Sequence, residues 1–292
     1  VRAAGQDVWW RPVVETGLTE ERWVRAIEVK PSFPAGRKVV HHVLTLLEQH
    51  EQGVTNLAST AAHSGRMNAG LFMEWAVGKT GEIFAPDAGK LMLPGARIRW
   101  EVHYYTIGEP IQNDVVELGI WFYPKGFVPK NRTILRMFNA APNSELDIAP
   151  NQKAMVQNFY VLPAPARLEN FQPHMHMRGR AMSMEAIYPD GRREVLSMVS
   201  NFQWRWHVNY IYADQAAPLL PKGTVLVFTA WHDNTKDNLN NPDPAQWVGW
   251  GDRTVDEMAH AWVDVTYLEQ EDYDRLVAER KARTASKADA PR

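Results

Sequence analysis

The chain has 292 residues, a length that suits two domains of about 150 residues each. Its 32 Lys and Arg residues nearly balance 34 Asp and Glu residues, and the formal net charge of −2 argues against binding to nucleic acid or to an anionic membrane surface. It contains no cysteine, which excludes disulfides, Cys-ligated zinc, iron–sulfur clusters and thiol nucleophiles.

Short runs rich in Val, Ile, Tyr and Trp, bounded by Pro, Gly and Asn, are typical of β-strands. They predict strands at residues 24–29, 39–47, 96–105, 115–123, 155–162, 181–188, 193–199, 224–231 and 261–268. The turn residues at 189–191 predict a hairpin. No apolar run approaches the ~18 residues of a membrane-spanning helix.

Helical pattern is scarce. A weak stretch lies at residues 56–63, and a charged one at 269–283 leads into a polar tail that we expect to fray. The predicted fold is therefore all-β, with two consecutive jelly-roll (β-sandwich) domains and a short C-terminal helix. Turn-rich residues 138–152 favour domains at 1–138 and 139–270, followed by a tail at 271–292.

Several histidines fall where they suit metal binding. His174 and His176 are two residues apart, so in a strand both rings project from one face. His41 and His42 are adjacent, and they can bind one ion only at a strand end or a bulge. His103 lies in an aromatic strand. Each of these motifs also has a structural interpretation when taken alone. His174 and His176 are compatible with a solvated surface strand, and His41 and His42 with one buried and one exposed histidine. His103 is compatible with a core position.

Met258 follows a polar, Asn- and Asp-rich stretch at residues 233–243. A methionine most often fills a gap in a core. The stretch lacks the regular alternation and terminal Glu of a calcium loop, so an ordinary long turn is the better interpretation.

Together these motifs carry a resemblance to a known family. Between about residues 24 and 268, the chain resembles the copper type II, ascorbate-dependent monooxygenases, the family of peptidylglycine α-hydroxylating monooxygenase and dopamine β-monooxygenase. Four motifs occur in the family's order. They are the His-His pair in residues 39–44, the Val-His-Tyr at 102–104, the His-x-His in 173–179 and the Asp-Glu-Met at 256–258.

The resemblance implies two jelly-roll domains facing across a cleft, with one copper ion bound by each. His41, His42 and His103 would bind the electron-transfer copper. His174, His176 and Met258 would form the catalytic site, holding the copper that activates O2. Imidazole suits both copper oxidation states, and a thioether favours Cu(I).

The implied reaction is hydroxylation of a C–H bond. R–H, O2, two electrons and two protons give R–OH and water, with the electrons supplied by an external reductant, either ascorbate or a redox protein. The expected partners are a small-molecule substrate, O2 and this electron donor, with neither nucleic acid nor a membrane span.

The chain departs from the family's peptide-amidating branch at the positions that grip a substrate carboxylate. Gln172, His260 and Trp262 stand where that branch has Arg, Asn and Tyr. A C-terminal glycine peptide is therefore not the expected substrate. We expect these three residues to face a different, more apolar substrate, and a structural role for His260 and Trp262 is the alternative.

The chain begins at Val1 without a signal sequence, so we expect either a removed signal or a piece cut from a longer bacterial protein that carries a redox module. The expected location is periplasmic or extracellular. A copper-binding or copper-delivery protein without hydroxylase activity is the main alternative. A cupin-type site fits poorly, because the first acidic residue after His176 is Glu185, too far along the chain.

Two other histidines, His207 and His232, are not expected to be metal ligands. His207 lies in an aromatic cluster and is expected in the core or lining the cleft. His232 is expected to hydrogen-bond within the Asn- and Asp-rich turn, and the alternative is that it lines the surroundings of the second copper.

Overall fold

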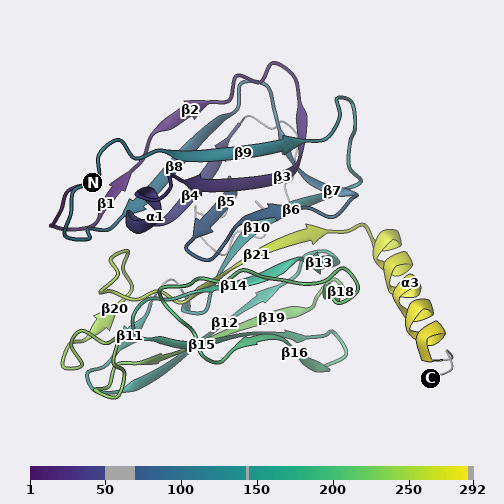
Figure 1. Cartoon of the computed structure of the whole chain (residues 1–292). Coiled ribbons are helices and arrows are strands. Elements are labelled where there is room, and N and C mark those ends of the chain that lie inside the picture. The colour runs from purple at the N-terminus through teal and green to yellow at the C-terminus, as the bar shows by residue number, and fades with distance from the viewer. Residues whose placement is uncertain (50–69, 143–144, 289–292) are drawn as a thin grey trace.

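The computed structural model describes residues 1–49, 70–142 and 145–288. The described chain is mainly β-sheet, arranged as two stacked halves with helix α3 at one end (Figure 1). The predicted all-β class with a short C-terminal helix is confirmed. The weak helical stretch expected at residues 56–63 lies outside the described residues.

The first half contains a five-stranded sheet and part of a ten-stranded sheet, which enclose one hydrophobic core between them. The five-stranded sheet comprises β1 (Val8–Trp10), β2 (Val13–Glu15), β8 (Arg97–Tyr104), β4 (Val40–Glu48) and β5 (Leu71–Ala76). The facing strands are β9 (Val116–Phe122), β3 (Arg22–Pro31), β6 (Gly81–Ile83) and β7 (Ala88–Met92). A short helix, α1 (Gly36–Val39), leads directly into β4.

The second half repeats this arrangement around its own core. The remaining strands of the ten-stranded sheet are β10 (Asn131–Asn139), β21 (His260–Tyr267), β14 (Asn170–His174), β13 (Ala166–Leu168), β17 (Tyr210–Ile211) and β18 (Leu219–Leu220). The four-stranded sheet is β12 (Lys153–Val161), β19 (Val225–Asp233), β15 (Gly179–Ile187) and β16 (Arg193–Val199). A small ribbon joins β11 (Asp147–Ile148) to β20 (Val248–Gly249).

The two halves are joined both by packing and by hydrogen bonding. Leu44 and Leu46 of β4 pack against Leu135 and Met137 of β10 and Trp262 of β21 in a third apolar cluster. The strands at this junction are buried on both faces, because each has a sheet on either side.

The ten-stranded sheet crosses between the halves where β7 pairs in parallel with β10. The predicted boundary at residue 138 falls at the end of β10, and β10 pairs along its length with β21 of the second half.

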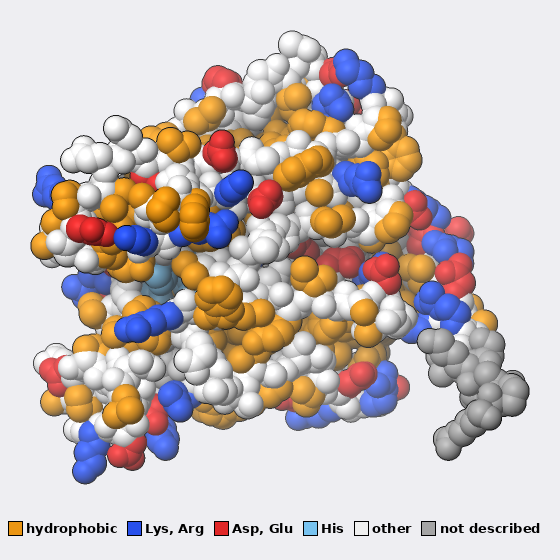
Figure 2. All heavy atoms as spheres, viewed as in Figure 1, with side chains coloured by type: hydrophobic (Ala, Val, Ile, Leu, Met, Phe, Trp, Pro, Cys, Tyr) orange, Lys and Arg blue, Asp and Glu red, His pale blue; other side chains and the backbone are white. Residues whose placement is uncertain are grey.

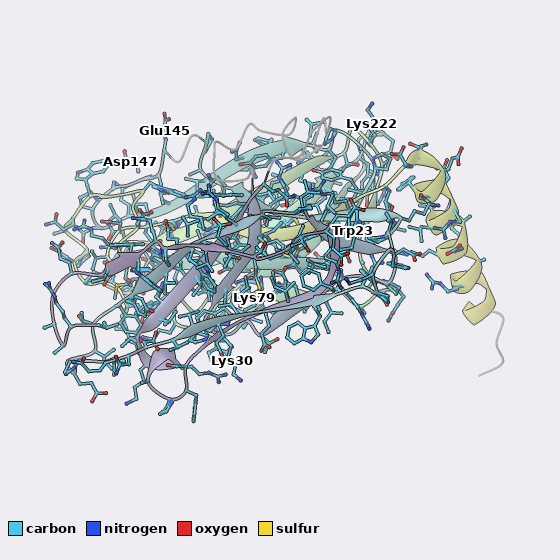
Figure 3. All side chains as sticks on the ribbon, turned by 90° about the horizontal axis from the view of Figure 1, so that it is seen from above. Trp23, Lys30, Lys79, Glu145, Asp147 and Lys222 are labelled. Atoms are coloured by element: carbon cyan, nitrogen blue, oxygen red, sulfur yellow. The ribbon has the colours of Figure 1, made fainter. Side chains whose placement is uncertain are left out.

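A chain of buried ionic groups also links the halves. Lys90 in β7 lies 3.2 Å from both Glu82 and Asp264, and Asp264 belongs to β21. Glu82 in turn pairs with Lys79 at 2.5 Å, and Lys79 lies 3.6 Å from Glu74. Figure 3 shows Lys79 within the body of the molecule, whereas Lys30 and Lys222 lie at its periphery and are exposed. Removing one partner from such a buried network would leave an uncompensated charge.

The predicted hairpin and C-terminal helix are present. Strands β15 and β16 are antiparallel, and Gly191 at the turn has a φ of 85°, which glycine adopts without steric cost. Helix α3 (Gln270–Ala288) begins where predicted and continues past the expected end. None of the described helices combines the length and apolar character that crossing a bilayer requires.

Candidate metal centre

The first predicted ligand set is assembled by a β-bulge. In the pairing of β4 with β8, Val40 lies opposite Tyr104 and His42 opposite His103, so His41 is an additional residue without a partner. A bulge breaks the alternation of strand side chains and allows two adjacent residues to project together. This is one of the two geometries in which adjacent histidines can share an ion.

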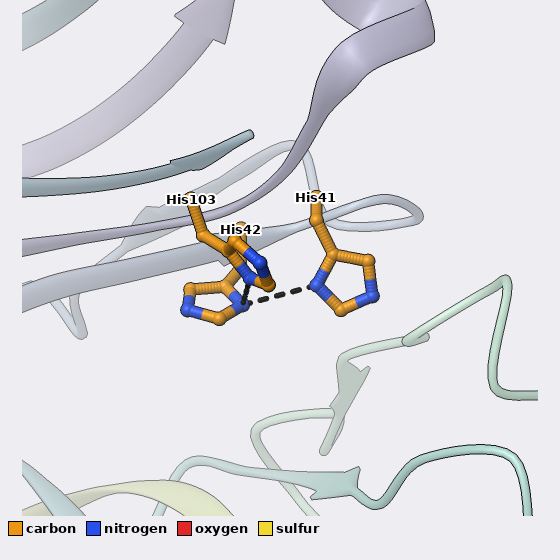
Figure 4. A group of neighbouring side chains, drawn as sticks. All are labelled: His41, His42 and His103. Carbon is orange, nitrogen blue, oxygen red and sulfur yellow. Dashed lines mark hydrogen bonds between the residues drawn. The ribbon is translucent and has the colours of Figure 1, made fainter. Parts of the chain in front are cut away.

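The rings of His41, His42 and His103 converge through the same type of nitrogen. The Nδ1 of His42 lies 3.1 Å from Nδ1 of His41 and 3.4 Å from Nδ1 of His103 (Figure 4). A metal bonded to imidazole at about 2.0–2.1 Å in tetrahedral geometry would hold its ligand nitrogens about 3.3–3.4 Å apart. Both distances from His42 match this spacing, and one ligand atom from each of the three residues lies within 4.8 Å of the other two.

Two residues of the N-terminal segment contact the ring of His103 and fix its orientation. Its Nε2 lies 3.0 Å from the Asp7 carboxylate, and its ring stacks on Trp9 at a centroid distance of 4.5 Å. The hydrogen bond with His103 lowers the pKa of Asp7 below its ordinary value. A carboxylate on the far nitrogen orients a metal-binding imidazole and raises its basicity.

The second predicted set comes from two separate segments. His174 ends β14, opposite His260 at the start of β21. His176 follows on the loop, and its Nδ1 lies 3.2 Å from the carbonyl oxygen of Asp256, which leaves Nε2 as the nitrogen available to a metal. Met258 lies two residues before β21 and is buried.

The buried carboxylate of Glu257 holds these segments together. It accepts hydrogen bonds from the backbone N–H groups of His176 at 2.9 Å, Arg178 at 2.5 Å and Met258 at 3.2 Å. Burial outweighs these bonds and raises the pKa of Glu257 to about 7.

His232 supports the same segment. Its Nε2 lies 3.1 Å from the carbonyl oxygen of Met258. The expectation that His232 hydrogen-bonds within the Asn- and Asp-rich turn is therefore wrong, whereas the alternative, a position beside the second predicted site, agrees with this contact. Strand β19 carries its ring beneath the ligand segment, because the sheet pairs His232 with Gly179 rather than with the turn.

The two ligand sets lie against each other across the junction of the halves. The ring centroids of His42 and His174 are 5.7 Å apart, and those of His41 and His176 are 6.3 Å apart. Figure 2 shows a histidine within the hollow between the two halves. Sequence motifs alone did not predict this proximity.

Two cavities border the histidines. The smaller, about 60 Å³, is lined by residues of both sets, including His42, His174 and Met258, together with His260 and Trp262. That is room for a diatomic molecule or about two waters. A larger cavity of about 440 Å³ has His41 and His207 in its wall.

The three residues expected to face a substrate have different positions. His260 and Trp262 line the smaller cavity, and His260 stacks on His174 at 4.6 Å. Gln172 is fully buried opposite Trp262 and is not part of that cavity wall. Their roles toward a substrate remain predictions.

Four of the predicted ligand histidines have lowered pKa values, and two of them have ring nitrogens without a partner among the described residues. Burial lowers the pKa of His41, His42 and His174 well below the ordinary value of 6.5, and that of His176 to about 4. Within residues 1–49, 70–142 and 145–288, both ring nitrogens of His174 and the Nε2 of His176 form no hydrogen bond. Neutral imidazoles with free lone pairs are the form that binds a metal.

Some contributors to the site were missed by sequence reasoning. Asp7 and Glu257 are not predicted metal ligands but hold the residues that are. Asp7 belongs to no motif, and Glu257 lies in the Asp-Glu-Met motif, of which only Met258 was predicted to be a ligand. The sequence indicated only that His207 lies in an aromatic cluster, either in the core or lining the cleft. Its position in the wall of the larger cavity agrees with the second of these expectations.

Comparisons with known proteins leave the function open. No protein-family model and no curated protein matches the chain. Among solved structures, the VP2 subviral particle of infectious bursal disease virus is 10% identical, with 91% of this chain and 73% of that chain covered and a TM-score of 0.26.

The STIV MCP is likewise 10% identical, covering 80% of this chain and 99% of that one, with a TM-score of 0.23. A two-domain protein of unknown function from Bacteroides fragilis is 9% identical over 90% of this chain and 95% of that one, with a TM-score of 0.19. TM-scores this low carry no argument about fold or function.

Proposed function

We propose that this protein is a two-copper monooxygenase that hydroxylates a C–H bond of a small organic substrate, using O2 and two electrons from an external reductant such as ascorbate or a redox protein. One observation supports this most strongly. The six residues singled out by the family resemblance come from four separate segments of the chain and gather, buried, at the junction of the two halves. Among the described residues, both ring nitrogens of His174 and the Nε2 of His176 have no hydrogen-bonding partner.

The donor sets suit copper. The Nδ1 atoms of His41 and His103 lie 3.1 and 3.4 Å from that of His42, which matches the spacing around one ion, and neutral imidazole binds both Cu(I) and Cu(II). The second set adds the Met258 thioether, a soft donor that favours Cu(I) and is rarely recruited by zinc. A thioether would make no such contribution to a magnesium or calcium site.

Copper at these positions would supply one-electron transfer and the reductive activation of O2. The protein's own residues orient the donors and exclude water. Asp7 fixes the ring of His103 through its Nε2. Glu257 ties the backbone of His176 to that of Met258, so the distance between these two donors is set by one buried carboxylate.

The cavities suit a small substrate. Beside Met258 there is space of about 60 Å³, walled by His260 and Trp262, which accommodates O2 and little more. The cavity of about 440 Å³ near His41 is large enough for a small organic molecule and has Arg37 and Arg205 in its wall. We infer from the family resemblance that the protein is a bacterial member acting in the periplasm or outside the cell.

A copper-binding or copper-delivery role is the second candidate. The small volume beside Met258 favours it, because a bulky substrate has no room there in this arrangement of the halves. This candidate predicts tight, reversible copper binding without substrate oxidation.

Copper stoichiometry tests the proposal first. Apo-protein is reconstituted with copper, excess is removed, and copper per chain is counted for wild type and Met258→Ala. We expect two ions in the wild type and a fall toward one in the variant. Met155→Ala, an exposed methionine on β12, is the matched control and should retain two.

The second step distinguishes the two functions. Ascorbate-dependent O2 consumption with C–H hydroxylation across a panel of small substrates would support the enzyme, and two bound coppers without turnover would favour the binding protein. One copper or none, unaffected by Met258→Ala, would contradict both two-site assignments.

A further inference from the structure

The larger cavity, of about 440 Å³, lies where the two halves meet and draws its wall from both of them. The first half contributes Arg37, His41 and Tyr105, and the second contributes Arg205 and His207. The volume falls in the range of pockets that bind small organic molecules. In Figure 2, Lys and Arg side chains border the hollow between the halves both above and below it.

The loop that connects β16 to β17 is fixed against the first half beside this cavity. The His207 backbone N–H donates to the Val77 carbonyl at 2.7 Å. Gly78 has a φ of 113°, and a Cβ there would meet the His207 backbone at 3.3 Å, so this close approach needs glycine. The contact holds Arg205, two residues earlier on the loop, at the cavity wall.

Both arginines in the wall lack a counter-ion among the described residues. Neither guanidinium forms an ion pair or a side-chain hydrogen bond there, and each lies over an aromatic ring instead. The Arg37 guanidinium is 5.7 Å from the ring centroid of Phe33, and that of Arg205 is 4.9 Å from the ring centroid of Trp204. A ring face leaves the five N–H donors of a guanidinium free, so both arginines can bind a ligand.

The wall also contains one carboxylate, which is already engaged. Asp7 lies 3.0 Å from the Nε2 of His103, and this hydrogen bond lowers the pKa of Asp7. The charged residues of the wall are therefore two arginines and one paired carboxylate. This balance attracts an anionic ligand and disfavours a cationic one.

His207 adds a neutral hydrogen-bonding group to the wall. Its side chain is buried, and neither ring nitrogen has a hydrogen-bonding partner in the part of the chain that the structure describes. Burial lowers the pKa of His207 to about 3, so the ring is neutral and carries one N–H. A buried N–H without a partner is unfavourable, and an oxygen atom of a ligand in the cavity would accept its hydrogen bond.

We propose that this cavity binds a small organic anion, whose acidic group pairs with Arg37 and Arg205 and accepts a hydrogen bond from His207. A planar, conjugated anion suits it best, because Tyr105 and Trp204 supply aromatic wall area.

Binding of the anion follows from the cavity wall, whereas its part in a reaction rests on the proposed function. His41 of the first ligand set borders the cavity and Met258 does not, so the anion would lie beside the first set. The anion is then either the electron donor or the substrate, and the test distinguishes the two.

The test measures the binding of benzoate and ascorbate, both anionic at neutral pH, by isothermal titration. The full chain is used without copper, so that neither ligand can coordinate the metal, and benzamide is the neutral match of benzoate. Arg37→Gln and Arg205→Gln each remove one guanidinium from the wall. Arg193→Gln, at an exposed arginine of β16 outside the cavity, is the control, and melting temperatures show that each variant is folded.

We expect Arg37→Gln and Arg205→Gln each to weaken anion binding by about tenfold or more. Arg193→Gln should stay within about twofold of wild type. Benzamide should bind the wild type at least about tenfold more weakly than benzoate and should not respond to the cavity variants. If the same variants also slow the anaerobic reduction of the copper-loaded protein by ascorbate, the anion is the electron donor. If that rate is unchanged, the anion is the substrate.

Binding of neither anion, or affinities that both cavity variants leave unchanged, would overturn this inference and leave the copper sites untouched. Arginine-dependent binding in a chain that holds no copper would overturn the proposed function and leave the anion site standing.

Discussion

The two ligand sets contain similar donors but are held in place in different ways. The first lies on two paired strands, and the β4 bulge and the β8 register position all three rings. The second combines a strand end, a loop and the segment before β21, and these are joined through Glu257. The first set is thus positioned by sheet hydrogen bonding, whereas the second depends on one buried carboxylate together with the contacts of His176 with Asp256 and of His232 with Met258.

This difference has a physical consequence. The first set is held by many backbone hydrogen bonds between β4 and β8. The loss of one side-chain contact to a histidine of this set should therefore leave its rings nearly in place. A carboxylate that accepts three backbone bonds concentrates the same task in one group. We therefore expect the second set to be the more sensitive to single substitutions.

Acid is the strongest way to disturb both sets at once. Burial lowers the pKa of these histidines below the ordinary value of 6.5, so their contribution to stability is complete above that pH and is lost as the pH falls toward their folded pKa values. These folded pKa values are about 4 for His176 and His232 and about 3 for His207 and His260. The affected residues are His41, His42, His174, His176, His207, His232 and His260.

Three buried carboxylates oppose this trend. Burial raises the pKa of Glu74 and Glu257 to about 7 and that of Asp264 to about 6, so their contribution is lost as pH rises through those values. The histidines outnumber them. We expect the apo-protein to lose on the order of 3–5 kcal/mol of unfolding free energy between pH 6.5 and 5.5, measured by urea denaturation. Stability that is constant or higher at pH 5.5 would contradict the neutral, buried state of these rings.

Glu257→Gln separates the two sets. The amide presents an NH2 group to backbone N–H donors, so we expect about 1–3 kcal/mol of destabilisation and a 10–100-fold loss of copper affinity at the second set only. Chelator competition and urea denaturation measure the two effects. Asp256→Asn, at a partly exposed neighbour paired with Arg253, is the control and should leave copper affinity nearly unchanged. Equal losses at both sets would break the comparison.

Asp7→Asn is the reciprocal change and the smallest. It keeps the shape of the side chain but removes the charge beside His103, so copper affinity at the first set should fall by about tenfold while the second set is unaffected. Asp7 is partly exposed, and we expect less than about 1 kcal/mol of change in unfolding free energy. Isothermal titration with copper measures the first effect, and an unchanged first-set affinity would mean that Asp7 does not tune the site.

Local pattern was sufficient for strands with recognisable boundaries. Residues 193–199 were predicted and form β16, because flanking turns and β-branched residues mark both ends. Strands β5, β7, β10 and β14 were not predicted. Most of their residues are buried on both faces or include Pro, Gly or polar side chains, so they show neither clear alternation nor a typical strand composition.

The candidate site divides in the same manner. The donor types and their spacing could be read along the chain, because i and i+2 share a strand face and because the order of the motifs resembles that of a known family. Which rings face one another depends on contacts between residues far apart in sequence. Such contacts arise only in the folded chain. They include the pairing that creates the β4 bulge, the hydrogen bonds that Glu257 accepts from the His176 and Met258 backbone, and the approach of His207 to His174. Burial then removes water from the rings, and that desolvation, which no local pattern encodes, makes them neutral donors.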